Sequence, residues 1–464
     1  MTGDARLTAR VAASTRPEGS HSRAPRSVGV VGGGLLGLDI AYELAQQGVK
    51  VSVYEADKRL GGLAGSTKIG GVAVDRYYHA VTTTDDKVVS LAESLGLSIR
   101  WRPLGVGFYH DGQRCSMSTP VEVLRFPGLR LDDKARLAAF VLACGRIKDA
   151  EALDEQPIEA WARKLSGNRL WERLWAPLLD SKFDGHYDDL PATYLWSRMR
   201  RTAGTRSKGG REVMGAIEGG YQALVDRLAD RIRSLGGEVH TSTPVRHIPA
   251  SASGAAIGVV TDAGLQAHDT VVTTQLRPNL KGLLADELEH ALGPDPLRYM
   301  GIVCLVARVK QSVSPYYAIN ITDRRVPITS VVETTHAVDP EWVDGHLIYV
   351  PKYVRSTNPI LERSSEDITD EFLGHVQTLF PDFRREDVIA SQVARTTVAE
   401  PVHVASVANR IPPVFAAPGL AVASSARVHP NIVHGQAIAG VAEHVAGEVL
   451  ARLTTDNTQQ RSAA

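Results

Sequence analysis

The sequence predicts an α/β fold in two parts: a parallel sheet that carries a glycine-rich turn, and a second part with a mixed or antiparallel sheet and a helical cap. The first part is predicted by an apolar strand over 27–31 that runs directly into the glycine-rich segment 32–37. The second is predicted by four strand-length apolar runs that polar or proline-containing loops separate. These runs are 302–309, 317–321, 326–332 and 347–354.

Length and composition fit a large globular protein without a strongly charged partner. The chain has 464 residues, 43% of them hydrophobic, with 52 basic and 52 acidic residues. A net charge near zero gives no support for nucleic acid as a partner. Cys115, Cys144 and Cys304 form no C-x-x-C pair, which excludes a zinc ribbon or a disulfide-rich scaffold. We therefore expect a cytoplasmic protein without a metal site.

Both ends of the chain have the composition of tails. The first 26 residues carry five arginines among small and polar residues and lack the continuous apolar core of a secretory signal. This composition predicts a disordered tail over 1–26, with an organelle transit peptide as the alternative. A second tail is predicted over 456–464, which is rich in Thr, Gln and Ser. No apolar run approaches the ~18 to 20 residues that a membrane-spanning helix needs.

The glycine-rich turn and its surroundings predict a dinucleotide site. In Gly32-x-Gly34-x-x-Gly37 the first glycine permits the turn, the second lets the backbone approach a pyrophosphate, and the third lets the helix pack on the strand. The apolar residues at 38, 41, 42 and 45 mark the buried face of that helix, and Gly48 ends it. Glu55 follows the second strand, where a carboxylate accepts the ribose hydroxyls.

Later segments return to this first part. A helix follows Gly219-Gly220, with strands predicted over 238–240 and 244–248. A short strand over 420–423 precedes a helix that begins near Gln436. We therefore assign 27–85, 212–290 and 405–455 to the dinucleotide-binding part, and 86–211 and 291–404 to the part with the helical cap.

A second glycine pair narrows the choice among dinucleotide cofactors. The stretch from Glu55 to Gly61-Gly62 resembles the flavin-dependent amine oxidase, protoporphyrinogen oxidase and phytoene desaturase superfamily, in which it wraps the pyrophosphate and ribityl chain. The resemblance resumes at 219–224, at 243–248 and in the C-terminal helix. It implies a discontinuous, Rossmann-like FAD-binding domain of the glutathione-reductase type, with FAD as the cofactor.

The expected FAD contacts come from the turn, from the stretch after Glu55 and from the last helix. They are Gly32, Gly34, Leu35, Leu36, Gly37, Glu55, Ala56, Arg59, Gly61, Gly62, Leu63, Ala64, Val245, Ser424, Gly435 and Gln436. The resemblance places the backbone of Val245 against the adenine, and Gly435 and Gln436 beside the flavin pyrimidine. Relatives usually have a Gly-Asp pair where this chain has Ser424-Ser425, so Ser424 is expected to replace the carboxylate.

Hydride transfer to flavin N5 requires little acid-base machinery, so few catalytic residues can be predicted. The segment 75–79 lies where the family returns towards the isoalloxazine ring, which makes His79 a candidate polar group above the flavin; a structural histidine is the alternative. Tyr349 and Lys352 are further candidates, against core packing for Tyr349 and a solvated position for Lys352.

Residues that differ from the family's usual pattern bear on which reaction the protein is expected to catalyse. Many amine oxidases carry a lysine on the strand matching 299–309, and this chain has none there, which favours a dehydrogenase, a desaturase or an oxidase of the protoporphyrinogen type. No cysteine lies near 424–435 to attach the flavin, although His429 and His434 are candidate attachment points beside packing roles. A basic cluster after Trp196 is either a solvated helix end or a phosphate site. It comprises Arg198, Arg200, Arg201, Arg206, Lys208 and Arg211.

The resulting expectation is an FAD-dependent oxidoreductase that takes a hydride from a small, largely apolar organic substrate. Two alternatives share the architecture. One is a redox-neutral isomerase or sugar-nucleotide mutase that uses reduced flavin, and the other is a prenyl-binding escort protein that holds no flavin. Peripheral membrane contact through apolar cap helices, such as one over 138–143, and the oligomeric state are left open.

Overall fold

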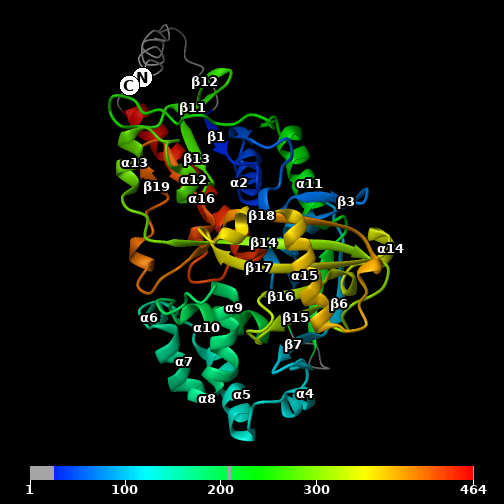
Figure 1. The fold of residues 1–464 in the computed structure, drawn as a ribbon. Helices are drawn as coiled ribbons and strands as arrows, with labels where there is room; N and C mark the ends of the chain where they lie inside the picture. Colours follow the sequence, from blue (N-terminus) through cyan, green and yellow to red (C-terminus); the bar gives the residue numbers. More distant parts are fainter. Residues whose placement is uncertain (1–25, 206–210, 463–464) are drawn as a thin grey trace.

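The computed structural model describes residues 26–205 and 211–462 and confirms the predicted mixture of α and β structure. Figure 1 shows a parallel sheet at the top, a larger sheet across the middle and a group of cap helices at the bottom. Most of the predicted tail over 1–26 lies outside the described residues.

The parallel sheet is built from three distant segments of the chain. Its order is β10-β2-β1-β13-β20-β19, and every pair is parallel except β19 with β20. Its strands are β1 (Ser27–Val31), β2 (Lys50–Tyr54), β10 (Glu238–His240), β13 (Thr270–Thr273), β19 (Phe415–Ala417) and β20 (Leu420–Val422). In the centre Val30 pairs with both Val53 and Val272, and all three are fully buried. Burial on both faces explains the continuous apolar runs of these strands.

Three helices cover one face of the parallel sheet: α2 (Leu35–Gln46), α11 (Gly220–Ser234) and α16 (Gly435–Ser462). The last helix begins next to the predicted Gln436. It continues to Ser462, into the segment 456–464 that is predicted as a tail, and 463–464 lie outside the described residues. α3 (Asp86–Ser94) packs beside α16.

The other face is covered by a hairpin and two short helices. These are β11 (Gly258–Thr261), β12 (Gly264–Ala267), α12 (Arg277–Leu280) and α13 (Asp286–Leu292). The strand predicted over 244–248 is wrong. His247 and Ile248 make single bridges to two different partners, Val260 and Leu284, so no continuous ladder forms.

The larger sheet has seven strands in the order β18-β14-β17-β16-β15-β7-β8, and only the β15–β7 pair is parallel. The four predicted apolar runs correspond to β14 (Arg298–Val309), β15 (Ala318–Ile321), β16 (Ser330–Glu333) and β17 (His346–Arg355). The remaining strands are β7 (Val106–His110), β8 (Gln113–Ser116) and β18 (Val388–Val402). β18 escaped prediction because most of it is only half-buried and polar residues interrupt its apolar ones.

The two faces of the larger sheet pack against different layers. α15 (Ser365–Leu379) covers one face. Smaller strands contribute to the other face. They are β3 (Ser66–Ile69), β4 (Val72–Asp75), β5 (Val81–Thr82), β6 (Ile99–Leu104) and β9 (Glu212–Ile217). Because side chains alternate along a strand, Tyr349 and Lys352 of β17 belong to opposite faces.

The cap is a group of helices whose buried aromatic residues form a separate core. They are α4 (Pro120–Arg125), α5 (Leu131–Arg146), α6 (Glu151–Asp154), α7 (Ile158–Ser166), α8 (Asn168–Leu170), the π-helical turn η2 (Trp171–Trp175), α9 (Ala176–Phe183) and α10 (Thr193–Ala203). Met300 and Val402 of the larger sheet join this core. Among the described helices, none combines the length and the apolarity needed to cross a bilayer.

Candidate functional site

The glycines of the first turn allow the chain to approach itself closely. Gly32 has φ +112°, and a Cβ there would lie 2.3 Å from Thr274 Oγ1. A Cβ on Gly37 would lie 2.0 Å from the carbonyl oxygen of Gly32. Only glycine fits either position without moving the backbone, so α2 can pack directly on the end of β1.

The second glycine pair meets the first turn. The Gly61 N–H donates to the Gly33 carbonyl at 2.8 Å, and Gly61 and Gly62 have φ +112° and +56°. A Cβ on Gly34 would meet only Gly61 O at 3.9 Å and Gly62 Cα at 4.0 Å. Gly34 caps α2 without a side-chain hydrogen bond. Uncapped N–H groups beside backbone-lined space fit the pyrophosphate of a dinucleotide. Leu35 and Leu36 open the helix there, and Leu63 and Ala64 follow the second pair.

Glu55 lies where a ribose ligand is expected. Its Oε2 accepts the Gly33 N–H at 2.7 Å and its Oε1 accepts the Asp57 N–H at 2.8 Å, which fixes the carboxylate against the turn. The Thr243 N–H donates to the Glu55 carbonyl at 2.8 Å and so brings the half-buried Val245 to the same side. Ala56 and Arg59 are exposed on the intervening loop.

The start of α16 joins three other elements. A Cβ on Gly435 would lie 2.7 Å from Tyr221 Oη at the start of α11. Gln436 Oε1 accepts the Lys87 N–H of α3 at 2.8 Å. Ser424 Oγ accepts the Ala426 N–H at 3.3 Å and thereby caps the short helix η7 (Ser425–Val428). Ser424 is therefore already engaged by backbone in the loop that precedes α16.

His79 lies beside this junction. Its ring centroid is 4.8 Å from that of Tyr221, and its Nδ1 is buried without a hydrogen-bond partner. Burial lowers the pKa of His79 to about 4, against a hydrogen bond to the Tyr77 backbone that raises it. The side chain nevertheless keeps 26% of its surface accessible. His79 is therefore largely buried, although part of its side chain can still be reached.

Tyr349 supports the strand end next to His79. Its side chain is buried, and its Oη donates to the backbone carbonyl of Asp75 at 2.8 Å. The Asp75 Oδ2 lies 3.9 Å from His79 Nδ1. Tyr349 thus holds the strand end that carries Asp75, and its own hydroxyl is occupied.

Lys352 is not brought to the same place. It shares a sheet face with Val303 and lies near Glu371 and His375 of α15. The structure therefore separates Lys352 from His79 by the thickness of the larger sheet, and Lys352 has no place in the site described below.

An ion pair joins the cap to the larger sheet. Lys182 Nζ of α9 lies 2.5 Å from Glu400 Oε2 of β18 and 3.2 Å from the centroid of the Tyr353 ring. Tyr353 shares a hydrogen bond with Tyr78, the neighbour of His79. A cavity of about 30 Å³ lies beside Glu400 and is also lined by Tyr194. These polar residues were not predicted, because their contacts link segments that lie far apart in the sequence.

The predicted basic cluster does not form a single patch. Arg201 Nη2 donates to the buried Asp85 at 2.9 Å, Arg198 bonds to Tyr194, and Arg200 lies over the Trp196 ring at 5.3 Å. Arg211 is exposed, whereas Arg206 and Lys208 lie outside the described residues.

The two candidate attachment histidines both face carboxylates. His429 Nε2 lies 2.9 Å from Asp154 Oδ1, and His434 Nδ1 lies 3.7 Å from Asp85 Oδ1. Burial lowers the pKa of each histidine to about 4. Asp154 belongs to cap helix α6, so His429 connects the cap to the loop before α16.

Known proteins share the whole-chain architecture. A structure of an oxidoreductase from Methanosarcina mazei is 19% identical, with a TM-score of 0.70 over 90% of this chain and 99% of that one. Cyclohexylamine oxidase from Brevibacterium oxydans is 15% identical, with a TM-score of 0.63 over 92% of this chain and 100% of that one. At this level of identity the likeness shows a shared fold.

Sequence relatives match over a shorter region. Coproporphyrinogen III oxidase of Mycobacterium tuberculosis is 29% identical over 238 residues, which are 45% of this chain and 51% of that protein. The chain therefore spans about half the length of this relative.

Residues 37–445 match the family of flavin-containing amine oxidoreductases, and the chain belongs to that family. The predicted superfamily, the flavin cofactor FAD and the class of FAD-dependent oxidoreductase are confirmed at the level of the family.

Proposed function

We propose that this member of the flavin-containing amine oxidoreductases takes a hydride from a small organic substrate held between the larger sheet and the cap. The observation that carries the proposal is His79, a largely buried imidazole whose ring packs against Tyr221, the residue that the start of α16 also approaches. When bound, FAD would supply a hydride acceptor at N5. An enclosed site excludes water from such a transfer.

The residues present fit the cofactor. The uncapped start of α2 and the open position at Gly34 would take the pyrophosphate, and Glu55 would take the ribose. Gly435 and Gln436 would lie by the flavin pyrimidine, where the start of α16 stabilises negative charge.

The residues where the cap meets the larger sheet indicate what kind of substrate the site would hold. A largely apolar substrate is expected from sequence, yet Lys182, Glu400, Tyr78 and Tyr353 gather where the cap meets the sheet. We propose a substrate with charged or hydrogen-bonding groups at this end. Porphyrinogens belong among the test compounds because a relative is named for one. A dehydrogenase, a desaturase or a protoporphyrinogen-type oxidase remains favoured over an amine oxidase, since β14 carries no lysine.

Anaerobic flavin-reduction screening tests the proposal. The purified holoprotein is mixed with amines, tetrapyrroles, polyenes, and prenyl or sugar phosphates while the flavin absorbance is recorded. Bleaching by one class identifies the substrate class. Turnover only after prior reduction of the flavin would instead establish redox-neutral chemistry, and a colourless protein that FAD does not reconstitute would contradict the proposal.

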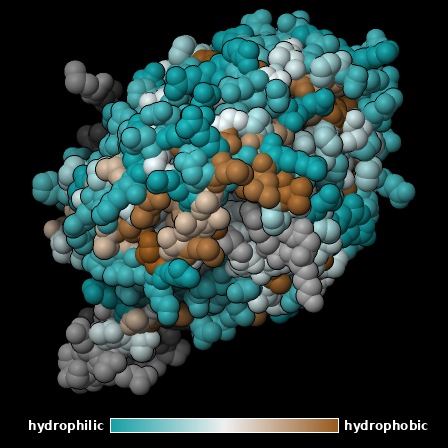
Figure 2. All heavy atoms as spheres, turned by 90° about the horizontal axis from the view of Figure 1, so that it is seen from below, coloured by the Kyte–Doolittle hydropathy of each residue, from teal (hydrophilic) through white to brown (hydrophobic). Residues whose placement is uncertain are grey.

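We also propose that the outer face of the cap makes peripheral contact with an anionic membrane. Figure 2 looks onto this end of the molecule and shows hydrophobic residues gathered among hydrophilic ones. Leu131 and Leu142 of α5 are 73% and 61% exposed. Exposed basic side chains flank them, whereas Asp132 is the one exposed acid among residues 120–148. The basic residues are Arg125, Arg130, Arg136, Arg146 and Lys148. Apolar side chains within a basic rim suit an anionic lipid surface.

A further inference from the structure

Asp75 is a largely buried carboxyl beside His79. It ends β4, and the Tyr221 N–H at the start of α11 donates to it. A Cβ on Gly220 would lie 2.7 Å from Oδ1, so the carboxyl lies directly on the backbone of that helix. Only 17% of its side chain is accessible. The ionisable group paired with it is His79, at 3.9 Å.

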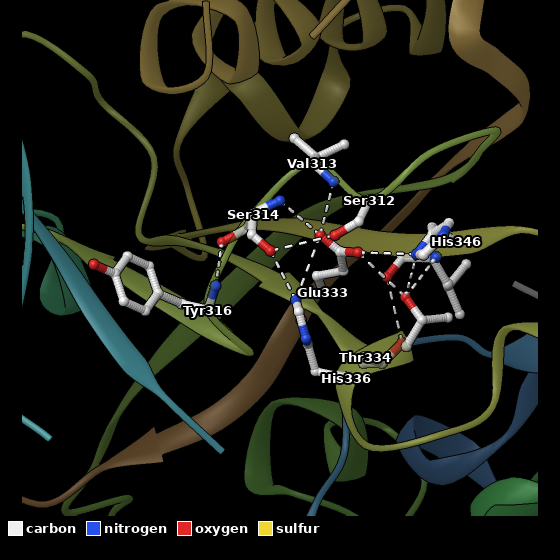
Figure 3. A network of polar contacts seen from close by, with 10 residues as sticks. Ser312, Val313, Ser314, Tyr316, Glu333, Thr334, His336 and His346 are labelled. Atoms are coloured by element: carbon white, nitrogen blue, oxygen red, sulfur yellow. Dashed lines mark hydrogen bonds and ion pairs between the residues drawn. The ribbon is translucent and has the colours of Figure 1, made fainter. Parts of the chain in front are cut away.

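The Asp75–His79 pair differs from another buried carboxylate, Glu333, in how fully its polar atoms are hydrogen-bonded. Figure 3 shows Glu333, a buried carboxylate whose Oε2 accepts the N–H groups of Val313 at 3.0 Å and Ser314 at 2.8 Å. Its Oε1 lies 3.1 Å from His346 Nδ1. Every oxygen of Glu333 thus has a partner at hydrogen-bond distance. His79 Nδ1, in contrast, is buried without one, and such an atom is costly unless it has a use.

We propose that Asp75 is the proton-accepting partner of His79, and that this pair receives the proton that a substrate releases together with its hydride. The inference rests on the proposed function. It assigns His79 the contact with the substrate and Asp75 a positioning and proton-holding role behind it.

The step balances with one proton and one hydride. A bound flavin would accept the C–H hydride, and the X–H bond on the neighbouring atom would break so that its electron pair forms C=X. The released proton bonds to the imidazole of His79, and His79 passes one proton to Asp75 Oδ2. The 3.9 Å separation must shorten for this transfer, as catalytic hydrogen bonds commonly do when substrate binds.

The direction of transfer agrees with the electrostatics. Burial raises the pKa of Asp75 to about 7, and burial lowers the pKa of His79 to about 4. A proton that reaches the pair therefore rests on Asp75. The other groups that face Asp75 are the hydroxyls of Tyr221, Tyr317 and Tyr349, whose pKa values burial raises, so none of them competes for a proton near neutral pH.

The test counts the protons taken up when the bound flavin is reduced. The negative charge of the reduced flavin raises the pKa of a nearby carboxyl, so Asp75 should take up a proton in addition to the one at N5. The midpoint potential of the holoprotein is measured from pH 6.5 to 9, and its slope gives the proton number. We expect close to two protons per two electrons near pH 8, and close to one for Asp75→Asn, whose amide oxygen still accepts the Tyr221 N–H.

Asp39→Asn is the matched control. Asp39 of α2 is also a buried carboxyl with its pKa raised by burial, to about 8, but its charged neighbours are Glu43, Glu443 and Lys87 instead of His79. Its removal should leave the proton number unchanged. An identical proton number in Asp75→Asn and the unaltered protein overturns the inference, while failure to hold FAD would count against the proposed function instead.

Infrared difference spectra of the unaltered holoprotein give a second measurement that needs no variant. Reduction should produce the C=O band of a protonated carboxyl, and that band should shift in D₂O. Its absence overturns the inference even if Asp75→Asn fails to fold.

Discussion

Two helical glycines, Gly37 of α2 at the glycine-rich turn and Gly145 of α5 in the cap, differ in how tightly the chain packs around them. In α2 a methyl group on Gly37 would lie 2.0 Å from the Gly32 carbonyl oxygen. In α5 of the cap, a methyl group on Gly145 would meet no atom within 4 Å. The turn is therefore specified by backbone shape, whereas the cap leaves its outer surface free and contributes through side chains such as Lys182.

Replacing glycine by alanine, once in α2 and once in α5, should show the largest difference between the glycine-rich turn and the cap. Gly37→Ala should give little soluble protein and no bound FAD, because α2 can no longer pack on β1. Gly145→Ala should keep FAD and gain up to about 1 kcal/mol in unfolding free energy, because alanine favours the helix. In both variants, the flavin absorbance per mole of protein measures FAD binding and thermal unfolding measures stability. Normal FAD binding by Gly37→Ala would refute the packing argument.

A buried carboxyl in the same helix gives the next largest effect. Burial raises the pKa of Asp39 from 3.8 to about 8, so the folded state holds a proton that the unfolded state loses above about pH 4. Stability should therefore fall as the pH rises from 4 to 8. Asp39→Asn removes this loss and should stabilise the protein by up to about 4 kcal/mol at pH 7, with little effect at pH 4. Denaturant unfolding at both pH values measures it, and an equal effect at both would contradict the assignment.

Removing one charge of the ion pair between the cap and the larger sheet should lower the stability of the protein. Lys182→Met leaves Glu400 enclosed without its cation, which should cost about 3 kcal/mol in unfolding free energy. Lys182→Met combined with Glu400→Gln should recover most of that loss, because neither charge then remains buried. Additive losses in this double-mutant cycle would show that the two residues do not interact.

The same contrast explains what could be predicted from sequence. Gly32, Gly37 and Gly61 are recognisable because a tight turn imposes residue types on a short segment. Lys182 and Glu400 lie 218 residues apart and have no local signature. The pairing of Asp75 with His79 was not predicted, because the Tyr221 N–H that holds Asp75 comes from a distant helix. The strand predicted over 244–248 fails for the same reason, since its bridge partners, Val260 and Leu284, lie in two separate segments of the chain.

The smallest effect on stability should come from the outer face of the cap. Leu131→Ser combined with Leu142→Ser changes exposed side chains and should leave unfolding nearly unchanged. It should weaken binding to vesicles of phosphatidylglycerol and phosphatidylcholine at least about tenfold, because two leucines no longer enter the lipid. Leu235→Ser, an exposed leucine at the end of α11, is the control and should bind as the unaltered protein does. Sedimentation with the vesicles measures the change. If the double leucine variant bound vesicles as well as Leu235→Ser does, the membrane contact would lie elsewhere. If the unaltered protein bound neutral vesicles as strongly as anionic ones, the basic rim would have no role in the contact.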